Sequence, residues 1–229
     1  MATDSHVAAH TTSPALAIPM RDRLGALAGI GFAILFVLSV FLIASGLPGG
    51  EDTNAIIARR YAESDRFAST LITLYSFMLA GAGLLWFLAS LTLHLRRAGA
   101  RAGALRALAL DGGLICVMAL LTAAAATAAI AASIEFGEET DIQPMVASIG
   151  WLGSVMLTIP AMIGAGIAII AISLEILRGG LPRWLAWLGL GCAAVIILLG
   201  WAFMPMLALP LWTLAAGVAL LRAQSGGSA

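Results

Sequence analysis

The chain has 229 residues, of which 61% are hydrophobic and 10% are charged, and its mean hydropathy is +1.02. Soluble globular domains carry about 25% charged residues, so this composition excludes that class and indicates a polytopic α-helical membrane protein. The formal net charge is zero, and no basic tract is long enough to indicate nucleic-acid binding.

The amino-terminal part predicts a tail followed by a first membrane span. Residues 1–20 are polar and rich in small residues, and we expect a disordered cytoplasmic tail there. Arg21 and Arg23 then precede an apolar run over residues 24–47. The run is longer than the core of a signal peptide, which has about 7–15 residues, and no clear cleavage site follows it. The pattern therefore predicts an uncleaved first helix.

The segment after the first span predicts a short amphipathic helix on the outer face of the membrane. Over residues 53–66, Ile57 and Tyr61 share one helical face, while Arg59 and Glu63 stand four residues apart and can pair on the wet side. An apolar face opposite a charged face is typical of interfacial helices. A plain solvated loop is the alternative.

Five further apolar runs complete a predicted bundle of six transmembrane helices over residues 21–222, followed by a polar tail at 223–229. The fourth run is longer than the roughly 20 residues that a perpendicular crossing needs, so it requires tilt, a kink near Pro160 or an extension beyond the bilayer. Together with 24–47, the predicted spans are about 67–95, 105–134, 144–177, 184–204 and 207–222.

The arginines predict the orientation of the bundle. All basic residues are arginines, and the six-span order places nine of them on one side and three on the other. Short loops rich in Lys and Arg stay on the cytoplasmic side, so both termini are predicted in the cytoplasm. Four tryptophans near the ends of the last two spans are predicted at headgroup level: Trp184, Trp187, Trp201 and Trp212.

Small residues predict close helix packing. Such residues recur at helical spacing and let the backbones of neighbouring membrane helices approach each other. A faint internal echo also links residues 81–91 with residues 164–174, because in both Gly-Ala-Gly is followed by a Ser-Leu pair whose serine stands seven residues after the second glycine. It suggests a repeat of helical hairpins, with chance as the alternative. The small-residue sets are Gly25 with Gly29, Ala124 with Ala128 and Ala132, and Ala161 with Ala165.

Three ionisable residues are candidates for a polar site. Ionisable side chains within membrane helices are costly and usually functional. Asp111 lies inside the third span, and Glu175 and His94 lie near the inner ends of the fourth and second. One interpretation is a shared pocket near the inner leaflet that accepts protons or cations. The alternative is a set of interfacial ion pairs, with Asp111 joined to Arg106, and Glu175 to Arg178 or Arg183.

Other signals predict contacts rather than chemistry. Cys116 and Cys192 lie inside apolar runs and are interpreted as packing residues. The sequence contains no known catalytic or metal-binding motif, so no catalytic residue, metal or cofactor is predicted. Arginines beside helix ends can attract anionic lipid headgroups. The candidates for this role are Arg96, Arg97, Arg101, Arg106, Arg178 and Arg183.

Two segments carry a resemblance to a family. Residues 85–97 read LWFLASLTLHLRR, and residues 181–189 read LPRWLAWLG. Both resemble a group of uncharacterised six-span integral membrane proteins of high-GC Gram-positive bacteria, which often have Gly in place of Ala89 and Ala186. The resemblance implies a cytoplasmic-membrane location and the six-helix layout. It implies no activity, ligand or site residue.

The sequence leaves three functional hypotheses. The first is a non-enzymatic accessory or scaffold component of the membrane, surrounded by lipid and bound to another membrane protein or to further copies of itself. The second is a small-solute or lipid transporter with a polar site near the inner leaflet. The third and weakest is a membrane-embedded enzyme, because a reaction needs positioned acid, base or metal groups.

Overall fold

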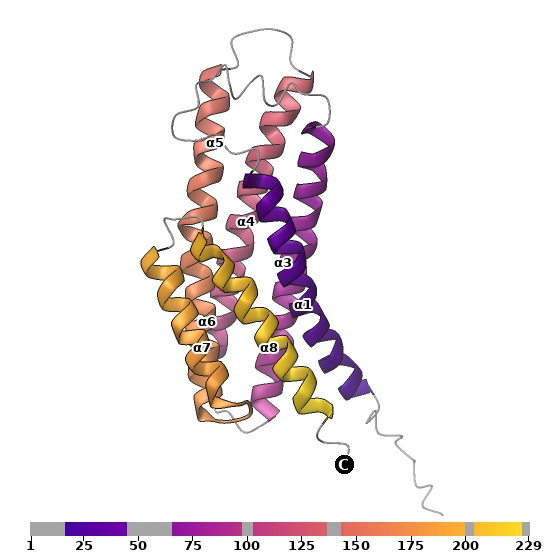
Figure 1. The fold of residues 1–229 in the computed structure, drawn as a ribbon, viewed down its shortest axis with the longest axis vertical. Coiled ribbons are helices and arrows are strands. Elements are labelled where there is room, and N and C mark those ends of the chain that lie inside the picture. The colour runs from indigo at the N-terminus through magenta and orange to yellow at the C-terminus, as the bar shows by residue number, and fades with distance from the viewer. Residues whose placement is uncertain (1–16, 45–65, 98–102, 137–142, 200–203, 226–229) are drawn as a thin grey trace, which may run out of the picture.

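The computed structural model describes residues 17–44, 66–97, 103–136, 143–199 and 204–225, and their regular structure is helical throughout (Figure 1). The predicted all-α class is therefore confirmed for this part of the chain. The helices are α1 (Ala17–Ala44), α3 (Arg66–Arg97), α4 (Ala104–Phe136), α5 (Gln143–Thr158), α6 (Pro160–Arg178), α7 (Arg183–Leu199), the 3-10 helix η1 (Met204–Leu207) and α8 (Ala208–Ser225).

Five of the described segments are long and apolar enough to cross a membrane: Arg23–Leu42, Ala68–Arg97, Ala104–Ser133, Ser148–Arg178 and Met204–Ala223. The protein is therefore a membrane protein built from apolar helices. Helix α7 has 17 residues and is about 26 Å long, slightly less than the roughly 30 Å of bilayer hydrocarbon. Length alone does not establish the sixth predicted crossing. The predicted interfacial helix over residues 53–66 lies, except for Arg66, outside the described residues.

The long fourth apolar run is divided at Pro160. Helix α5 ends at Thr158, and Pro160 occupies the first turn of α6, where its missing N–H removes no bond that the new helix needs. Backbone hydrogen bonds continue across the break, from Ile159 N to Val155 O and from Ile163 N to Ile159 O, both at 2.9 Å. The two helices therefore stay stacked. Of the three alternatives for the long fourth apolar run, namely tilt, a kink near Pro160 and an extension beyond the bilayer, the structure shows a break at Pro160.

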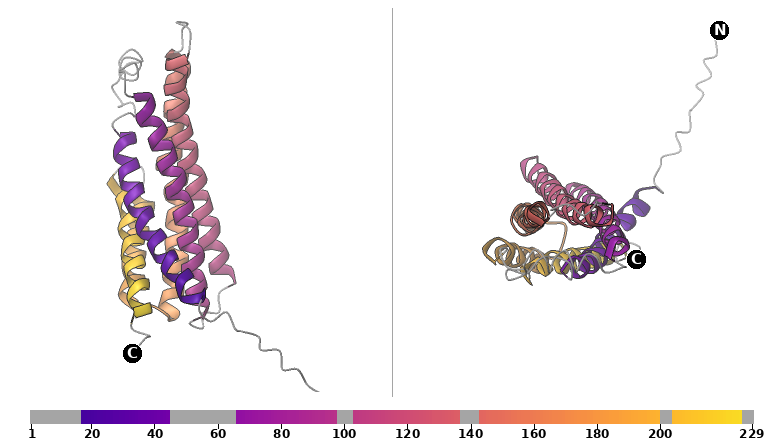
Figure 2. Two further views of the ribbon diagram at one scale, coloured as in Figure 1. Left: turned by 90° about the vertical axis from the view of Figure 1, so that its right-hand side faces the viewer. Right: turned by 90° about the horizontal axis from the view of Figure 1, so that it is seen from above.

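The helices form a closed bundle. Helix α1 packs against α3 and α8, α4 packs against α3, α5 and α6, and α7 packs against α6 and α8 (Figures 1 and 2). Helix α4 has 33 residues and is about 50 Å long, nearly twice the length of α7. Figure 1 accordingly shows α4 and α5 extending beyond the upper ends of α7 and α8.

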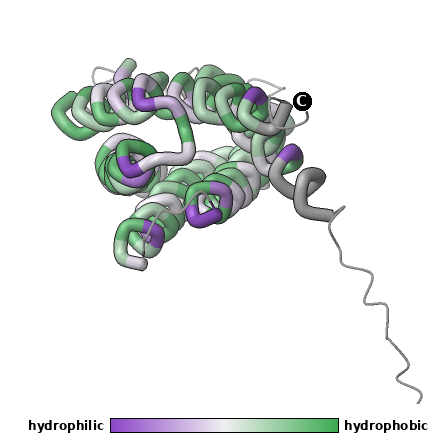
Figure 3. The backbone as a smooth tube through the Cα atoms, turned by 90° about the horizontal axis from the view of Figure 1, so that it is seen from below, coloured by the Kyte–Doolittle hydropathy of each residue, from purple (hydrophilic) through white to green (hydrophobic). Residues whose placement is uncertain are grey.

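One end of the bundle is basic. The starts of α1, α4 and α7 and the ends of α3, α6 and α8 all lie at the lower end in Figure 1. Figure 3, seen from that end, shows hydrophilic patches at the helix termini. Gly179, with a φ of 132°, ends α6 and allows the tight turn into α7. The described arginines at this end are Arg23, Arg96, Arg97, Arg106, Arg178, Arg183 and Arg222.

Glycines bring the helices into close contact. Gly25 and Gly29 of α1 leave no room for a methyl group against Ser90 and Phe87 of α3, which confirms the predicted packing role of this pair. The tightest crossing joins α4 and α6. A methyl group on Gly164 would lie 2.6 Å from both the Gly112 carbonyl oxygen and a backbone nitrogen of α4. Backbone therefore meets backbone at this crossing.

The two Gly-Ala-Gly segments occupy equivalent packing positions. In α3, Gly81 faces α4 and Gly83 faces α1, whereas in α6, Gly164 faces α4 and Gly166 faces α7. Each segment thus uses its first glycine against α4 and its second against an antiparallel neighbour on the other side. The sequence echo has a counterpart in the packing of the helices.

The serines that follow these segments continue the equivalence. Ser90 of α3 sits directly against Gly25 of α1, and Ser173 of α6 sits directly against Gly189 of α7. In each helix the serine follows the second glycine of the segment by seven residues, which places the serine and this glycine on the same helical face. The α1–α3 and α6–α7 pairs are therefore held together by the same contact.

The tryptophans divide between the surface and the core. Trp184 and Trp187 are 55% and 65% exposed, as expected for residues that face lipid or headgroups. The prediction for Trp212 is wrong, because its side chain is 0% exposed and packs edge-on against Phe87 with 6.2 Å between ring centroids. Gly189 lies against its indole and makes room for it. Trp201 lies outside the described residues.

Candidate functional site

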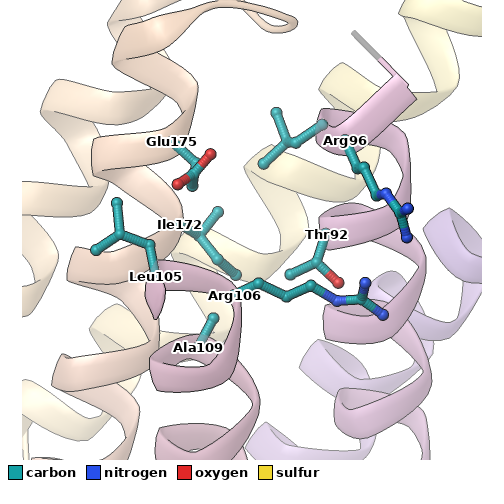
Figure 4. Close-up of a pocket in the computed structure, with 8 residues that line it drawn as sticks. Thr92, Arg96, Leu105, Arg106, Ala109, Ile172 and Glu175 are labelled. Atoms are coloured by element: carbon teal, nitrogen blue, oxygen red, sulfur yellow. The ribbon is translucent and has the colours of Figure 1, made fainter. Parts of the chain in front are cut away.

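A small polar pocket lies at the basic end of the bundle, where α3, α4 and α6 meet (Figure 4). Its volume is about 10 Å³, which is enough for a single water molecule. The hydrophobic lining comes from all three helices, and the polar lining consists of one threonine, two arginines and one glutamate. The lining residues are Thr92, Leu95, Arg96, Leu105, Arg106, Ala109, Ile172 and Glu175.

Glu175 is the buried charge of this pocket. The residue is 4% exposed, and its Oε1 accepts a hydrogen bond from Arg178 Nη1 at 3.2 Å. This contact confirms the predicted ion pair of Glu175 with Arg178. The other carboxylate oxygen, Oε2, is buried and has no hydrogen-bond partner among the described residues. A buried acceptor without a donor is costly, so Oε2 is able to accept a hydrogen bond that the described residues do not supply.

Two arginines stand across the pocket from this carboxylate. Arg96 of α3 is exposed and Arg106 of α4 is half-buried, and neither forms an ion pair within the described part of the chain. Figure 4 shows their guanidinium groups on the opposite side of the pocket from Glu175, beyond Thr92. The Thr92 hydroxyl donates to the Ala89 carbonyl at 3.0 Å and keeps its acceptor capacity. The site therefore presents separated negative and positive groups.

The structure brings only one of the three predicted polar-site residues into the pocket. Asp111 is exposed on α4 and has no ion-pair partner among the described residues, and His94 is half-buried; neither lines the pocket with Glu175. Thr92 was missed, although it precedes Arg96 by four residues and so shares its helical face. Of the other predicted lipid contacts, Arg97, Arg178 and Arg183 are exposed, and Arg101 lies outside the described residues.

Two larger, apolar hollows of the described part lie along α1 on the outside of the bundle. One groove, between α1 and α3, has a volume of about 480 Å³ and is lined in part by Gly31, Gly83 and Trp86. The other, between α1 and α8, has a volume of about 790 Å³ and is lined in part by Phe41 and Leu211. Hydropathy did not reveal these grooves, because an exposed apolar residue in a membrane helix has the same sequence signature as a buried one.

Both cysteines are free and buried. Cys116 is 0% exposed and Cys192 is 7% exposed, as expected for packing residues. We predict that a membrane-permeant maleimide leaves Cys116 unmodified in the folded protein and labels it after denaturation, as measured by the mass of the peptide that contains it. Labelling of native Cys116 at the rate of a free thiol would contradict the packing of α4 against its neighbours.

Among the described residues, no group of three His, Cys, Asp or Glu side chains could hold a metal ion.

Comparison with known proteins gives no relative. No protein-family model, no curated protein and no solved structure matches the chain. The resemblance of residues 85–97 and 181–189 to a six-span family stays a prediction.

Proposed function

We propose that the protein is a non-enzymatic accessory or scaffold component of the bacterial cytoplasmic membrane, and that it binds a transmembrane helix of another protein or of a second copy. The observation that carries this proposal is the contrast between the packed interior and the hollowed outer surface. The polar pocket holds about one water molecule, whereas the grooves beside α1 have volumes of about 480 and 790 Å³ and are lined by apolar side chains.

The grooves have the features of helix-docking surfaces in lipid. Membrane helices associate through small residues that let backbones approach, and Gly31 in the α1–α3 groove has nothing within 4 Å of the position of an added methyl group. Phe41 and Ile34 beside the α1–α8 groove are 64% and 63% exposed. A partner helix that packs into a groove gains van der Waals contacts that disordered lipid chains make less well.

The orientation follows from the basic end. Arginines gather where α1 begins and α8 ends, so we place both termini in the cytoplasm by the positive-inside rule. Helix α7 starts at the same end as α8 finishes, which supports a sixth crossing by α7 in spite of its 17 residues. A short helix can span by local thinning of the bilayer.

The proposal predicts that filling the α1–α3 groove releases a partner. Gly31→Leu places a branched side chain where the partner helix would pack. In native mass spectrometry of gently extracted membranes, we therefore expect the fraction of the chain that carries a co-purified polypeptide to fall several-fold. Gly191→Leu on α7 is the matched control, because Gly191 also has nothing within 4 Å of an added methyl group and does not line this groove. Isolation of the wild-type chain as a monomer without any added polypeptide would contradict the scaffold role.

One observation favours a second candidate, a small-solute or lipid transporter. Among the described residues, the buried Oε2 of Glu175 has no hydrogen-bond partner in a pocket at the basic end, and ionisable groups within membrane helices are usual on substrate or ion pathways. Transport requires the pocket to widen far beyond about 10 Å³. Solute or lipid flux into proteoliposomes that depends on Glu175 would favour this candidate over the scaffold. A membrane-embedded enzyme has less support, since Asp111 and His94 do not join Glu175 in the pocket.

A further inference from the structure

We propose that the pocket between α3, α4 and α6 binds a phosphoethanolamine-type headgroup, with its primary ammonium on Glu175 and its phosphodiester on Arg96 and Arg106. This proposal is independent of the scaffold role, because the pocket shares no lining residue with the grooves beside α1. It rests on three features of the site, namely the free carboxylate oxygen, the size of the pocket and the position of the two arginines.

The carboxylate determines one end of the ligand. Glu175 Oε2 is buried without a hydrogen-bond partner among the described residues, while Oε1 is held by Arg178. An ionised carboxylate only accepts hydrogen bonds, so the group that completes it must be a donor, and a cationic donor gives the stronger bond. Arg96 and Arg106 line the same pocket but are not within ion-pair distance of Glu175. The described residues therefore supply no donor for Oε2, and a ligand in the pocket can supply one.

The size of the pocket selects among cationic donors. A volume of about 10 Å³ admits a group of about the size of one water molecule. A primary ammonium is a compact point charge with three donors and fits this space. A trimethylammonium group is larger and has no N–H to donate, so a choline headgroup does not complete Oε2. The pocket thus favours a primary amine over a quaternary amine.

The arginines determine the other end of the ligand. Guanidinium groups bind phosphate oxygens through paired N–H donors, and basic residues at helix ends lie at the depth of lipid headgroups. Figure 4 shows the guanidinium groups of Arg96 and Arg106 on the side of the pocket away from Glu175. A ligand with an ammonium at one end and a phosphodiester at the other carries its charges in the matching order. A membrane aminophospholipid and a soluble glycerophosphoethanolamine share this chemistry.

The test is lipid binding to the full-length, delipidated protein by native mass spectrometry. Dioleoyl phosphatidylethanolamine is compared with dioleoyl phosphatidylcholine and dioleoyl phosphatidylglycerol, so that the acyl chains are constant. We expect phosphatidylethanolamine to bind about tenfold more tightly than either, in line with one charge-assisted hydrogen bond that the others lack. Equal retention of the three lipids, or a preference for phosphatidylglycerol, would overturn the proposal.

Two variants separate the two ends of the site. Glu175→Gln removes the ammonium partner and is expected to abolish the preference for phosphatidylethanolamine while phosphate binding remains. Arg106→Gln, at a half-buried position, is expected to weaken binding of all three lipids several-fold and keeps the proposal testable where Glu175→Gln does not fold. Asp111→Asn is the control, because it removes an acidic residue of α4 that does not line the pocket. An unchanged preference in Glu175→Gln would overturn the assignment of the ammonium site.

Competition by soluble glycerophosphoethanolamine distinguishes the two sources of the headgroup. If millimolar amounts displace the lipid from wild-type protein but not from Glu175→Gln, the headgroup alone is the ligand and a soluble metabolite can occupy the site. If the lipid stays bound and keeps its dependence on Glu175, the ligand is the membrane lipid. Both results support the site, whereas displacement that is equal in both proteins contradicts it.

Discussion

Replacing Gly164 by alanine is expected to lower the free energy of unfolding by about 1–3 kcal/mol, the usual cost of overpacking a close contact. The added methyl group would lie 2.6 Å from the carbonyl oxygen of Gly112 and from the backbone nitrogen of Cys116. Backbone atoms cannot rotate out of the way as the end of a flexible side chain can. Helices α4 and α6, which both contribute residues to the Glu175 pocket, would have to move apart.

The measurement is unfolding of the purified protein in mixed micelles, followed by tryptophan fluorescence as the denaturing detergent increases. Gly191→Ala is the control, because Gly191 is also helical and has nothing within 4 Å of an added methyl group. Alanine favours a helix over glycine by about 1 kcal/mol, so the control is expected to be neutral or stabilised. Equal stability of Gly164→Ala and the wild type would show that α4 and α6 do not cross backbone to backbone.

Hydropathy and loop composition were sufficient to place most helices. The predicted spans 67–95 and 105–134 correspond to α3 (Arg66–Arg97) and α4 (Ala104–Phe136). These boundaries were predictable because arginines and glycines interrupt the apolar runs where each helix leaves the hydrocarbon. The break at Pro160 was also foreseeable from chemistry, since proline cannot donate to the preceding turn.

Hydropathy and loop composition did not predict which side of each helix is buried in the bundle. Helix α4 is apolar around almost its whole circumference, so no amphipathic stripe shows which side is buried. Asp111 and Glu175 were both candidates for the polar site, yet Asp111 is exposed whereas Glu175 is 4% exposed and lines the pocket between α3, α4 and α6. Only the packing of neighbouring helices decides this difference. Thr92 was overlooked for the same reason, since its role depends on the helices that face it.

The echo between residues 81–91 and 164–174 shows how a weak sequence signal gains meaning from contacts. Small residues recur by chance in membrane helices, and the sequence alone could not exclude that explanation. The structure shows that Ser90 and Ser173 each meet a glycine of an antiparallel neighbour, Gly25 in α1 and Gly189 in α7. Because the two segments make equivalent contacts with neighbouring helices, a common packing unit is a better interpretation than chance similarity of sequence.

Truncation of Trp212 to alanine is expected to cost about 3–5 kcal/mol, the usual range when a buried aromatic side chain is removed. Trp212 is 0% exposed and packs edge-on against Phe87, with Gly189 beneath its indole. Lipid chains cannot enter an internal cavity at this junction of α3, α7 and α8. The lost van der Waals contacts are therefore not replaced.

The Trp212→Phe variant distinguishes the contribution of the aromatic ring to stability from that of the indole N–H. The indole Nε1 is buried without a hydrogen-bond partner among the described residues, so phenylalanine removes an unsatisfied donor and only part of the volume. We expect Trp212→Phe to lose much less stability than Trp212→Ala in the same unfolding assay. Trp187→Ala is the control and should change stability by no more than about 0.5 kcal/mol, because Trp187 is 65% exposed. If Trp212→Phe proved as unstable as Trp212→Ala, the indole N–H would have a partner, and the Ser173 hydroxyl is a candidate because it also lies against Gly189 and also has no hydrogen-bond partner among the described residues.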